Sequence, residues 1–261
     1  MFISVFDIFK IGVGPSSSHT MGPMIAAENY IALVNAFLQQ NPNANIDRIK
    51  CTLKGSLAFT GSGHATDSAV LLGVHGYKPE NLIDVDIPIL LGQLKDSTNI
   101  SALTSEVMFN PKQDIEFDFG DALFQHPNGM IMECLDKNGE RIHHEIYFSI
   151  GGGFITTIKE ISSIEAPIKS EPAQRFPYPF NNAESMLSLS NQNQTSISNM
   201  KLINEKEHLS DAQINIKINA IWQAMKTCIE NGLATEGILP GGLKVKRRAK
   251  NLYTQLNNEP D

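Results

Sequence analysis

Residues 14–23 read Gly14-Pro15-Ser16-Ser17-Ser18-His19-Thr20-Met21-Gly22-Pro23, and the rest of the chain can be organised around this run. Pro23 has no N–H and a φ fixed at about −65°, so it suits the first turn of a helix. The residues that follow predict that helix, because apolar side chains recur at helical spacing until Asn41-Pro42-Asn43: Ala27, Tyr30, Ile31, Val34, Phe37 and Leu38.

The hydroxyl-rich run lies just ahead of this predicted helix. A helix N-terminus offers backbone N–H groups without intrahelical partners and the positive end of the helix dipole. A small anion such as a carboxylate is held well there. The candidate binding residues are therefore Ser16, Ser17, Ser18, His19 and Thr20. The alternative is a capping loop, in which one hydroxyl caps the helix and the others are solvated.

Composition limits the classes of function. The chain has 261 residues, 41% hydrophobic and 19% charged, with a net charge of −7. We therefore expect one large or two small domains with a packed core, and no attraction to nucleic acid or to an anionic membrane. No apolar run approaches the ~20 residues of a membrane helix. The first ten residues lack a secretory pattern, so we expect a cytoplasmic protein.

The three cysteines, Cys51, Cys134 and Cys228, are far apart and form no C-x-x-C pair. We interpret them as small apolar residues, and they predict no metal site within the chain.

A second polar turn follows a predicted strand over residues 49–53. It reads Gly61-Ser62-Gly63-His64-Ala65-Thr66-Asp67 and leads into a predicted helix over 68–73. His64 thus lies in a glycine-rich turn at a helix start, where its side chain could reach a ligand. A further short helix is predicted over 89–93.

The periodicity then changes to that of strands, which we predict over 107–109, 115–119, 130–135 and 141–150. Asn138-Gly139 between the last two favours a tight hairpin. His126-Pro127-Asn128-Gly129 forms another polar turn. Gly151, Gly152 and Gly153 end the last strand, which suggests that a ligand or another segment approaches the backbone closely.

The remainder reads as a proline-rich linker and a helical segment. Closely spaced prolines mark the linker over 161–182. Helices are predicted over 183–190, 198–207 and 210–231, the last with a capping box of Ser210 and Gln213. The basic run over 244–250 is either a solvated face or a partner surface. We predict an α+β fold with a mixed α/β domain over 1–160, the linker over 161–182 and a helical segment over 183–261.

Histidines are the strongest chemical candidates. His19, His64 and His126 lie in turns with Gly or Ser, although a structural or solvated role stays open for each. His143 and His144 are adjacent on a strand and therefore point to opposite faces. The chain has no G-x-S-x-G elbow and no phosphate-binding glycine motif after a strand.

Taken together in order, these motifs resemble the iron–sulfur-dependent L-serine dehydratases. The resemblance rests on Ser4-Val5-Phe6-Asp7, residues 14–23, residues 61–67, His126 to Met130, Ser149 to Phe154 and Glu236 to Gly241. Residues 1–160 resemble the β domain of that family, which is similar to the serine-binding domain of some phosphoglycerate dehydrogenases. Residues from 183 resemble the beginning of its α domain.

The resemblance implies the conversion of L-serine to pyruvate and ammonia. It implies His64 as the base, with Asp67 either orienting it or stabilising the helix start. Residues 16–20 and Asn128 become candidates for binding the carboxylate and amino groups of serine, and His126, Gly151 and Gly152 are further candidates for substrate binding. Ser62 stands where many relatives have Lys, which puts in doubt a cation at that position.

The resemblance also implies a [4Fe–4S] cluster whose ligands belong to the remainder of the α domain, outside this chain. We therefore expect the 261-residue chain alone to be colourless and inactive. L-serine, the α-domain remainder and a second copy in a homodimer are the expected partners. The alternative is a serine-binding regulatory module without catalysis.

Overall fold

The computed structural model describes residues 4–83, 85–95, 97, 99–103, 106–163, 176–239 and 244–258. The chain forms two compact units. The sheet unit comprises Ile11–Ser163 and Thr235–Asp261, and the helical unit comprises Met1–Lys10 and Ile164–Ala234. The α+β prediction is confirmed, since a five-stranded mixed sheet with helices is joined to a helical segment.

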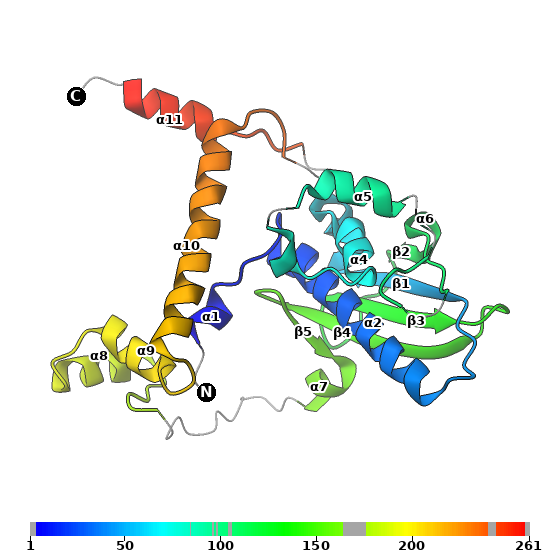
Figure 1. The fold of residues 1–261 in the computed structure, drawn as a ribbon, viewed down its shortest axis with the longest axis horizontal. Coiled ribbons are helices and arrows are strands. Elements are labelled where there is room, and N and C mark those ends of the chain that lie inside the picture. Colours follow the sequence, from blue (N-terminus) through cyan, green and yellow to red (C-terminus); the bar gives the residue numbers. More distant parts are fainter. Residues whose placement is uncertain are drawn as a thin grey trace. The chain divides into compact units, whose positions relative to one another are not determined.

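The sheet has the order β2-β1-β3-β4-β5 (Figure 1). Its strands are β1 Arg48–Gly55, β2 Ile115–Asp118, β3 Asn128–Leu135, β4 Arg141–Gly151 and β5 Phe154–Thr157. β1 and β2 are parallel, and the other neighbours are antiparallel. The predicted hairpin at Asn138-Gly139 joins β3 to β4, with Gly139 at φ 81°. Met108 makes isolated bridges to Arg48 and Asn99, so the strand predicted over 107–109 is reduced to a bridge.

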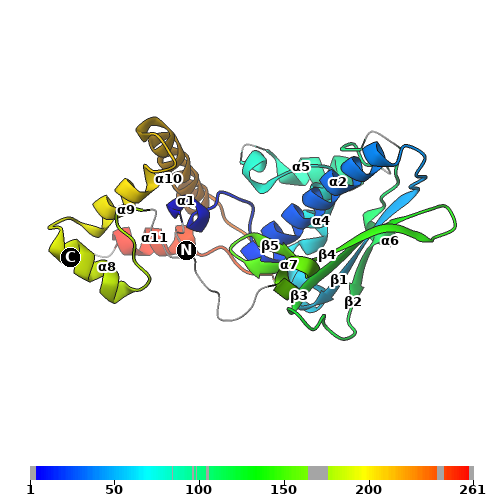
Figure 2. The ribbon, with the colours of Figure 1, turned by 90° about the horizontal axis from the view of Figure 1, so that it is seen from below.

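Helices cover one face of this sheet, as Figure 2 shows for α2 and α4. The longer helices of the unit are α2 Gly22–Gln40, α4 Thr66–Val74, α5 Ile87–Lys95 and α11 Ala249–Asn258. The shorter ones are η1 Ser17–Met21, α3 Ser56–Gly61, η2 Ser62–His64, η3 Pro79–Leu82, α6 Pro111–Asp114 and α7 Ile158–Ser163. The helix predicted from Pro23 is confirmed as α2, with the proline in its first turn.

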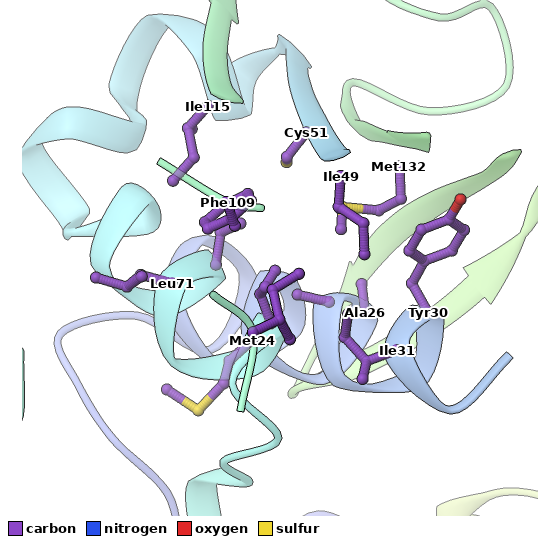
Figure 3. Packing of buried hydrophobic residues seen from close by; sticks show 14 of the residues in the cluster. Met24, Ala26, Tyr30, Ile31, Ile49, Cys51, Leu71, Phe109, Ile115 and Met132 are labelled. Atoms are coloured by element: carbon purple, nitrogen blue, oxygen red, sulfur yellow. The ribbon is translucent and has the colours of Figure 1, made fainter. Parts of the chain in front are cut away.

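The core lies between the helices and the sheet (Figure 3). Met24 and Tyr30 of α2, Leu71 of α4 and Ile49 of β1 are at most 1% exposed. Gly73 permits the close approach of α2 to α4, because a Cβ at this position would overlap the Met24 carbonyl oxygen and the Ala27 side chain. This packing fixes the start of α2, and with it the polar run of residues 16–20, against the sheet.

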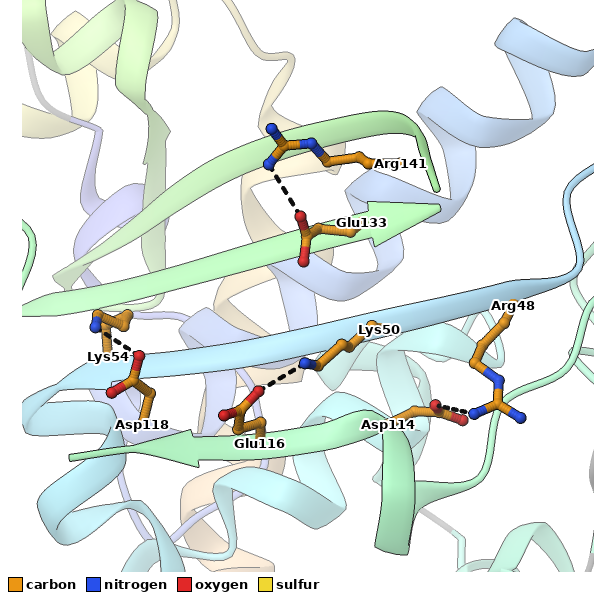
Figure 4. A network of polar contacts seen from close by, with 8 residues as sticks. All are labelled: Arg48, Lys50, Lys54, Asp114, Glu116, Asp118, Glu133 and Arg141. Atoms are coloured by element: carbon orange, nitrogen blue, oxygen red, sulfur yellow. Dashed lines mark hydrogen bonds and ion pairs between the residues drawn. The ribbon is translucent and has the colours of Figure 1, made fainter. Parts of the chain in front are cut away.

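Charged side chains of β1–β4 and of Asp114 at the end of α6 form ion pairs (Figure 4). Four ion pairs are formed: Arg48–Asp114 at 3.4 Å, Lys50–Glu116 at 2.7 Å, Lys54–Asp118 at 2.6 Å and Arg141–Glu133 at 3.0 Å. Most of these residues alternate along the strands with buried ones, so the sheet is apolar toward the helices and charged on its other side.

The helical unit consists of α1 Val5–Ile8, α8 Ala183–Gln192, α9 Ile197–Glu205 and α10 Asp211–Ala234. The predicted capping box is present, since Ser210 N donates to Gln213 Oε1 at 2.9 Å and Gln213 N donates to Ser210 Oγ at 3.3 Å. Glu205 is 4% exposed and binds the N-terminal segment. It accepts hydrogen bonds from Ser4 Oγ and Val5 N, each at 2.8 Å.

These compact units differ from the expected sequence domains at both ends. Residues 1–10 belong with the helical unit, and residues 235–261 belong with the sheet unit. α7 occupies 158–163 at the start of the expected linker, and residues 164–175 lie outside the described residues. The division at 160 and 183 stays a prediction.

Candidate active site

The run of residues 16–20 is not the loop that the sequence suggests, because Ser17–Met21 forms one turn of π-helix that continues into α2. Ser16 is the N-cap: its Oγ accepts from His19 N at 3.2 Å, and its carbonyl accepts from Thr20 N and Met21 N, each at 3.2 Å. These three amides are therefore already bonded within the turn. An anion bound here would take its donors from other amides and from the side-chain hydroxyls.

Thr20 is the buried member of the run, at 3% exposure. Its Oγ1 accepts from Ser16 N at 3.2 Å and donates to the His64 carbonyl at 2.8 Å. Ser17 is exposed and Ser18 is half-buried. These two hydroxyls are the more accessible ones for a ligand.

The His19 ring lies between two hydroxyl groups, one at each ring nitrogen. Its Nδ1 is 2.9 Å from Ser18 Oγ, and its Nε2 is 2.9 Å from Ser56 Oγ. Burial lowers the pKa of His19, a positive charge on His64 lowers it further, and the backbone of Ser56 as a hydrogen-bond partner opposes both. A neutral ring is thus favoured at this position.

His64 is held in η2 and is half-buried. Its Nδ1 lies 2.8 Å from the Thr60 carbonyl oxygen. A carbonyl can only accept, so Nδ1 carries the proton and the Nε2 of the neutral ring keeps its lone pair. The centroids of the His64 and His19 rings are 4.9 Å apart, with the rings inclined at 39°.

Two threonines join the segments that carry these histidines. Thr20, next to His19, donates to the His64 carbonyl, and Thr66 Oγ1 donates to the His19 carbonyl at 2.6 Å. The two hydrogen bonds cross between η1 and η2 in opposite directions. Each histidine backbone is therefore fixed by a hydroxyl from the other segment.

Asp67 lies in the first turn of α4 and is half-buried. Within the part of the chain that the structure describes, no hydrogen bond joins its carboxylate to His64, whose Nδ1 is bonded to Thr60 instead. The position at a helix N-terminus suits an acidic residue through the helix dipole. The catalytic role of Asp67 stays a prediction.

The turn at His126 and Asn128 lies beside the same segments. Ser56 N donates to the Pro127 carbonyl at 2.8 Å, and Ser56 Oγ reaches His19. Asn128 N donates to His126 Nδ1 at 3.1 Å, and Asn128 Nδ2 donates to the Ser149 carbonyl at 3.0 Å. Burial lowers the pKa of His126. The structure thus joins the three polar turns that were noted separately in the sequence.

Gly151, Gly152 and Gly153 form the turn between β4 and β5, with φ values of 94°, 61° and 74°. All three values lie in the region that favours glycine, so the turn itself accounts for this triplet. Two residues earlier, Ser149 packs against Gly22, where a Cβ would overlap its side chain. The end of β4 is thereby placed against the start of α2. Ligand binding by Gly151 and Gly152 stays a prediction.

The thiols of the chain do not fit a metal cluster. Cys51 and Cys134 are buried in β1 and β3, where burial raises the pKa of both thiols, that of Cys134 to about 11. Cys228 is exposed in the other unit. Among the described residues, no three His, Cys, Asp or Glu side chains gather as metal ligands, and no helix is long and apolar enough to cross a membrane.

Sequence reasoning found His19, His64, His126 and Asn128 but missed the groups that hold them. Ser56 and Thr60 belong to α3, which lies on an apolar-looking stretch after β1 and was not predicted. Thr66 stood inside the quoted motif, two residues after His64, and this spacing was the available signal.

Comparison with known proteins identifies the family of the chain. Residues 4–160 match the family model of the serine dehydratase beta chain, which is more than half of the chain. The chain therefore belongs to the serine dehydratase beta chain family, and every residue of the site described above lies within the matched range.

Several curated relatives match almost the whole chain. L-serine dehydratase of Haemophilus influenzae is 36% identical over 271 residues, covering 99% of this chain and 56% of the relative. That of Streptomyces coelicolor is 36% identical over 262 residues, covering 100% and 56%. L-serine dehydratase 1 of Escherichia coli is 36% identical over 259 residues, covering 97% and 54%. The chain spans about half the length of the curated relatives that it matches.

Proposed function

We propose that this chain supplies the base and the substrate-binding turns of an L-serine dehydratase, which converts L-serine to pyruvate and ammonia. The observation that carries the proposal is His64, whose Nδ1 is bonded to the Thr60 carbonyl so that Nε2 is left as a proton acceptor. The names of the relatives support serine as the substrate.

In this proposal, His64 Nε2 takes the proton from Cα of serine. The electron pair of the broken Cα–H bond forms the Cα=Cβ double bond, and the Cβ–O bond breaks. Aminoacrylate results, tautomerises to the imine and is hydrolysed to pyruvate and ammonia. Histidine suits the first step because its ordinary pKa lies near neutral pH.

Hydroxide is a poor leaving group, and its departure needs electrophilic assistance. The family resemblance assigns this assistance to a [4Fe–4S] cluster. Cys51 and Cys134 are buried in strands and Cys228 is a lone exposed thiol on α10, so these three do not fit such a cluster, and we propose that its ligands lie outside residues 1–261. The steps assigned to this chain are therefore proton abstraction and substrate binding.

We assign the carboxylate and amino groups of serine to the exposed hydroxyl of Ser17 and the half-buried hydroxyl of Ser18, with Asn128 and His126 on the neighbouring turn. The carboxylate would lie at the start of η1 and α2, where the helix dipole favours a negative charge. If serine amide competed as well as serine, a carboxylate would not be what this turn recognises. We also propose a homodimer in the cytoplasm, which sedimentation and cell fractionation test.

The experiment is the His64→Ala variant in a protein completed to the length of the relatives. We expect turnover of serine to fall by about 10²-fold or more, the scale of positioned proton transfer, with an unchanged circular dichroism spectrum. The matched control is His144→Ala, since His144 lies on β4 and has no part in the site. Near-normal turnover by His64→Ala would remove His64 from the base role.

The chain of 261 residues provides a second test. After anaerobic incubation with iron and sulfide, we expect no brown product and no pyruvate. A stoichiometric cluster that turns over serine would overturn the assignment of its ligands. Serine binding by the chain, together with an inactive completed protein, would favour the regulatory module instead.

A further inference from the structure

His19 differs from the other candidate residues because both of its ring nitrogens are bonded within the protein. Ser18 Oγ and Ser56 Oγ each lie 2.9 Å from one nitrogen. A hydroxyl can donate or accept, so a neutral imidazole is satisfied in either tautomer. Neither nitrogen is left to bind a substrate, which argues against the substrate-binding role expected from the sequence.

The position of the His19 ring is set by the same contacts that set His64. The Thr66 hydroxyl holds the His19 carbonyl, and the Thr20 hydroxyl holds the His64 carbonyl. The ring centroids are therefore held 4.9 Å apart. Two positive rings at this separation would repel each other strongly in a partly buried site.

The surroundings decide which ring takes a proton. The ionisable groups on the neighbouring elements are His64 of η2, Asp67 in the first turn of α4 and His126 of the adjoining turn. Burial is the main cause that lowers the His19 pKa, and of these groups His64 is the one whose charge lowers it further. Protonation of His19 is therefore disfavoured, both by burial and by any positive charge on His64.

We propose that His19 is a positioning residue for the dehydration: a doubly hydrogen-bonded ring that packs beside His64, holds it in place and adds no positive charge next to it. The inference rests on the proposed function of His64 as the base. If the His19 ring were protonated, its positive charge would oppose transfer of the substrate proton to His64. A neutral His19 ring does not oppose this proton transfer.

The first test uses the chain of 261 residues and needs no catalysis. Long-range ¹H–¹⁵N spectra of the imidazole rings report charge and tautomer between pH 8 and 5. We expect the His19 ring to stay neutral to a lower pH than an ordinary histidine, because its pKa is lowered by burial. In His64→Ala the His19 pKa should rise, because a neighbouring positive charge is removed.

A His19 ring that titrates at or above pH 6.5, or that does not respond to His64→Ala, would overturn the proposal. His144→Ala is the matched control and should leave the His19 signals unchanged. These outcomes do not depend on whether His64 is the base, so they can be separated from the activity of His64→Ala.

The second test is kinetic and uses the completed protein. His19→Asn keeps an acceptor near Ser18, and His19→Gln keeps one near Ser56. If His19 positions His64, both variants should lower kcat, by up to about 100-fold, with KM for serine nearly unchanged. A raised KM with an unchanged kcat would show that His19 binds substrate, and would overturn the proposal.

Discussion

Helices α2 and α10 carry apolar side chains at the same helical spacing, yet they differ in what they bury. In α2 of the sheet unit, Met24, Tyr30 and Val34 are fully buried against the sheet. In α10 of the helical unit, Trp222 is 58% and Ile229 is 57% exposed. The spacing of apolar residues thus predicts the helix, whereas the neighbouring elements decide whether its apolar face is buried.

The largest effect should come from removing a fully buried side chain of the sheet unit. Phe109 is 0% exposed within the core of Figure 3. Phe109→Ala should lower the free energy of unfolding of this unit by about 3–5 kcal/mol, since it leaves a cavity as well as lost apolar contact. Chemical denaturation followed by hydrogen exchange would measure this. A loss below about 1 kcal/mol would mean that the core is not closely packed around Phe109.

The next largest effect should come from the buried carboxylate of the helical unit. Glu205 accepts from Ser4 Oγ and Val5 N and pairs with Lys201 Nζ at 3.5 Å. Glu205→Ala should cost about 2–3 kcal/mol, because hydrogen bonds to a charged group are lost and two donors are left without it. A comparison variant is Ser4→Ala, which removes one of these bonds together with the cap that Ser4 Oγ gives to Phe6 N, and it should cost less than Glu205→Ala. Exchange protection should fall in α1 and α9 and not in the sheet.

Lowering the pH should have a smaller effect on stability, through the buried His75. Burial lowers the pKa of His75, and its ring is 6% exposed. A lowered folded pKa means that the unfolded chain binds protons first, so stability present above about pH 6.5 is lost as the pH falls below it. His75 contributes at most about 1.4 kcal/mol per pH unit in that window.

The variant His75→Asn tests this dependence. Asn keeps an acceptor for Ser101, whose hydroxyl lies 3.1 Å from Nδ1 of His75, but it does not titrate. The fall in melting temperature of the sheet unit between pH 7.5 and 5.5 should become smaller in the variant. An unchanged dependence on pH would contradict the prediction.

The smallest effect should be that of Trp222→Ala. This side chain is as large as any in the core, but most of its surface is already in contact with solvent. The free energy of unfolding, followed by thermal denaturation, should therefore change by no more than about 0.5 kcal/mol. Binding of a fluorescent apolar dye should decrease, because the exposed apolar area of α10 becomes smaller. A stability loss comparable to that of Phe109→Ala would abolish the contrast between the two helices.

The sequence predicted those elements whose local signals were sufficient. Pro23 and the apolar period predicted α2, Asn138-Gly139 predicted the hairpin, and Ser210 with Gln213 predicted the start of α10. β5 was missed because its four residues give a weak local pattern, whereas Leu252, Tyr253 and Leu256 give α11 a helical pattern that was not used. The π-helical turn was missed because it depends on the Ser16 carbonyl accepting from both Thr20 and Met21.

The candidate site shows the same limit. Glycine- and serine-rich turns identified His19 and His64 as candidates, because such turns bring side chains near ligands. Their hydrogen-bond partners depend on distant segments: Ser56 is 37 positions from His19, and Thr66 is 47 positions from it. The local sequence pattern carries no signal for such pairings. Only the folded structure therefore shows the contact between the His19 and His64 rings and the hydrogen bonds of Thr20 and Thr66.

The bonds from Ser4 and Val5 to Glu205 have a consequence for how the protein is made. Ser4 leaves the ribosome early, but its acceptor lies 201 positions later in the chain. At a translation rate of about 5–20 residues per second, the N-terminal segment waits about 10–40 s for Glu205 to be synthesised. All five strands are made during this interval. The sheet unit can therefore begin to fold before Ser4 and Val5 can form their hydrogen bonds with Glu205.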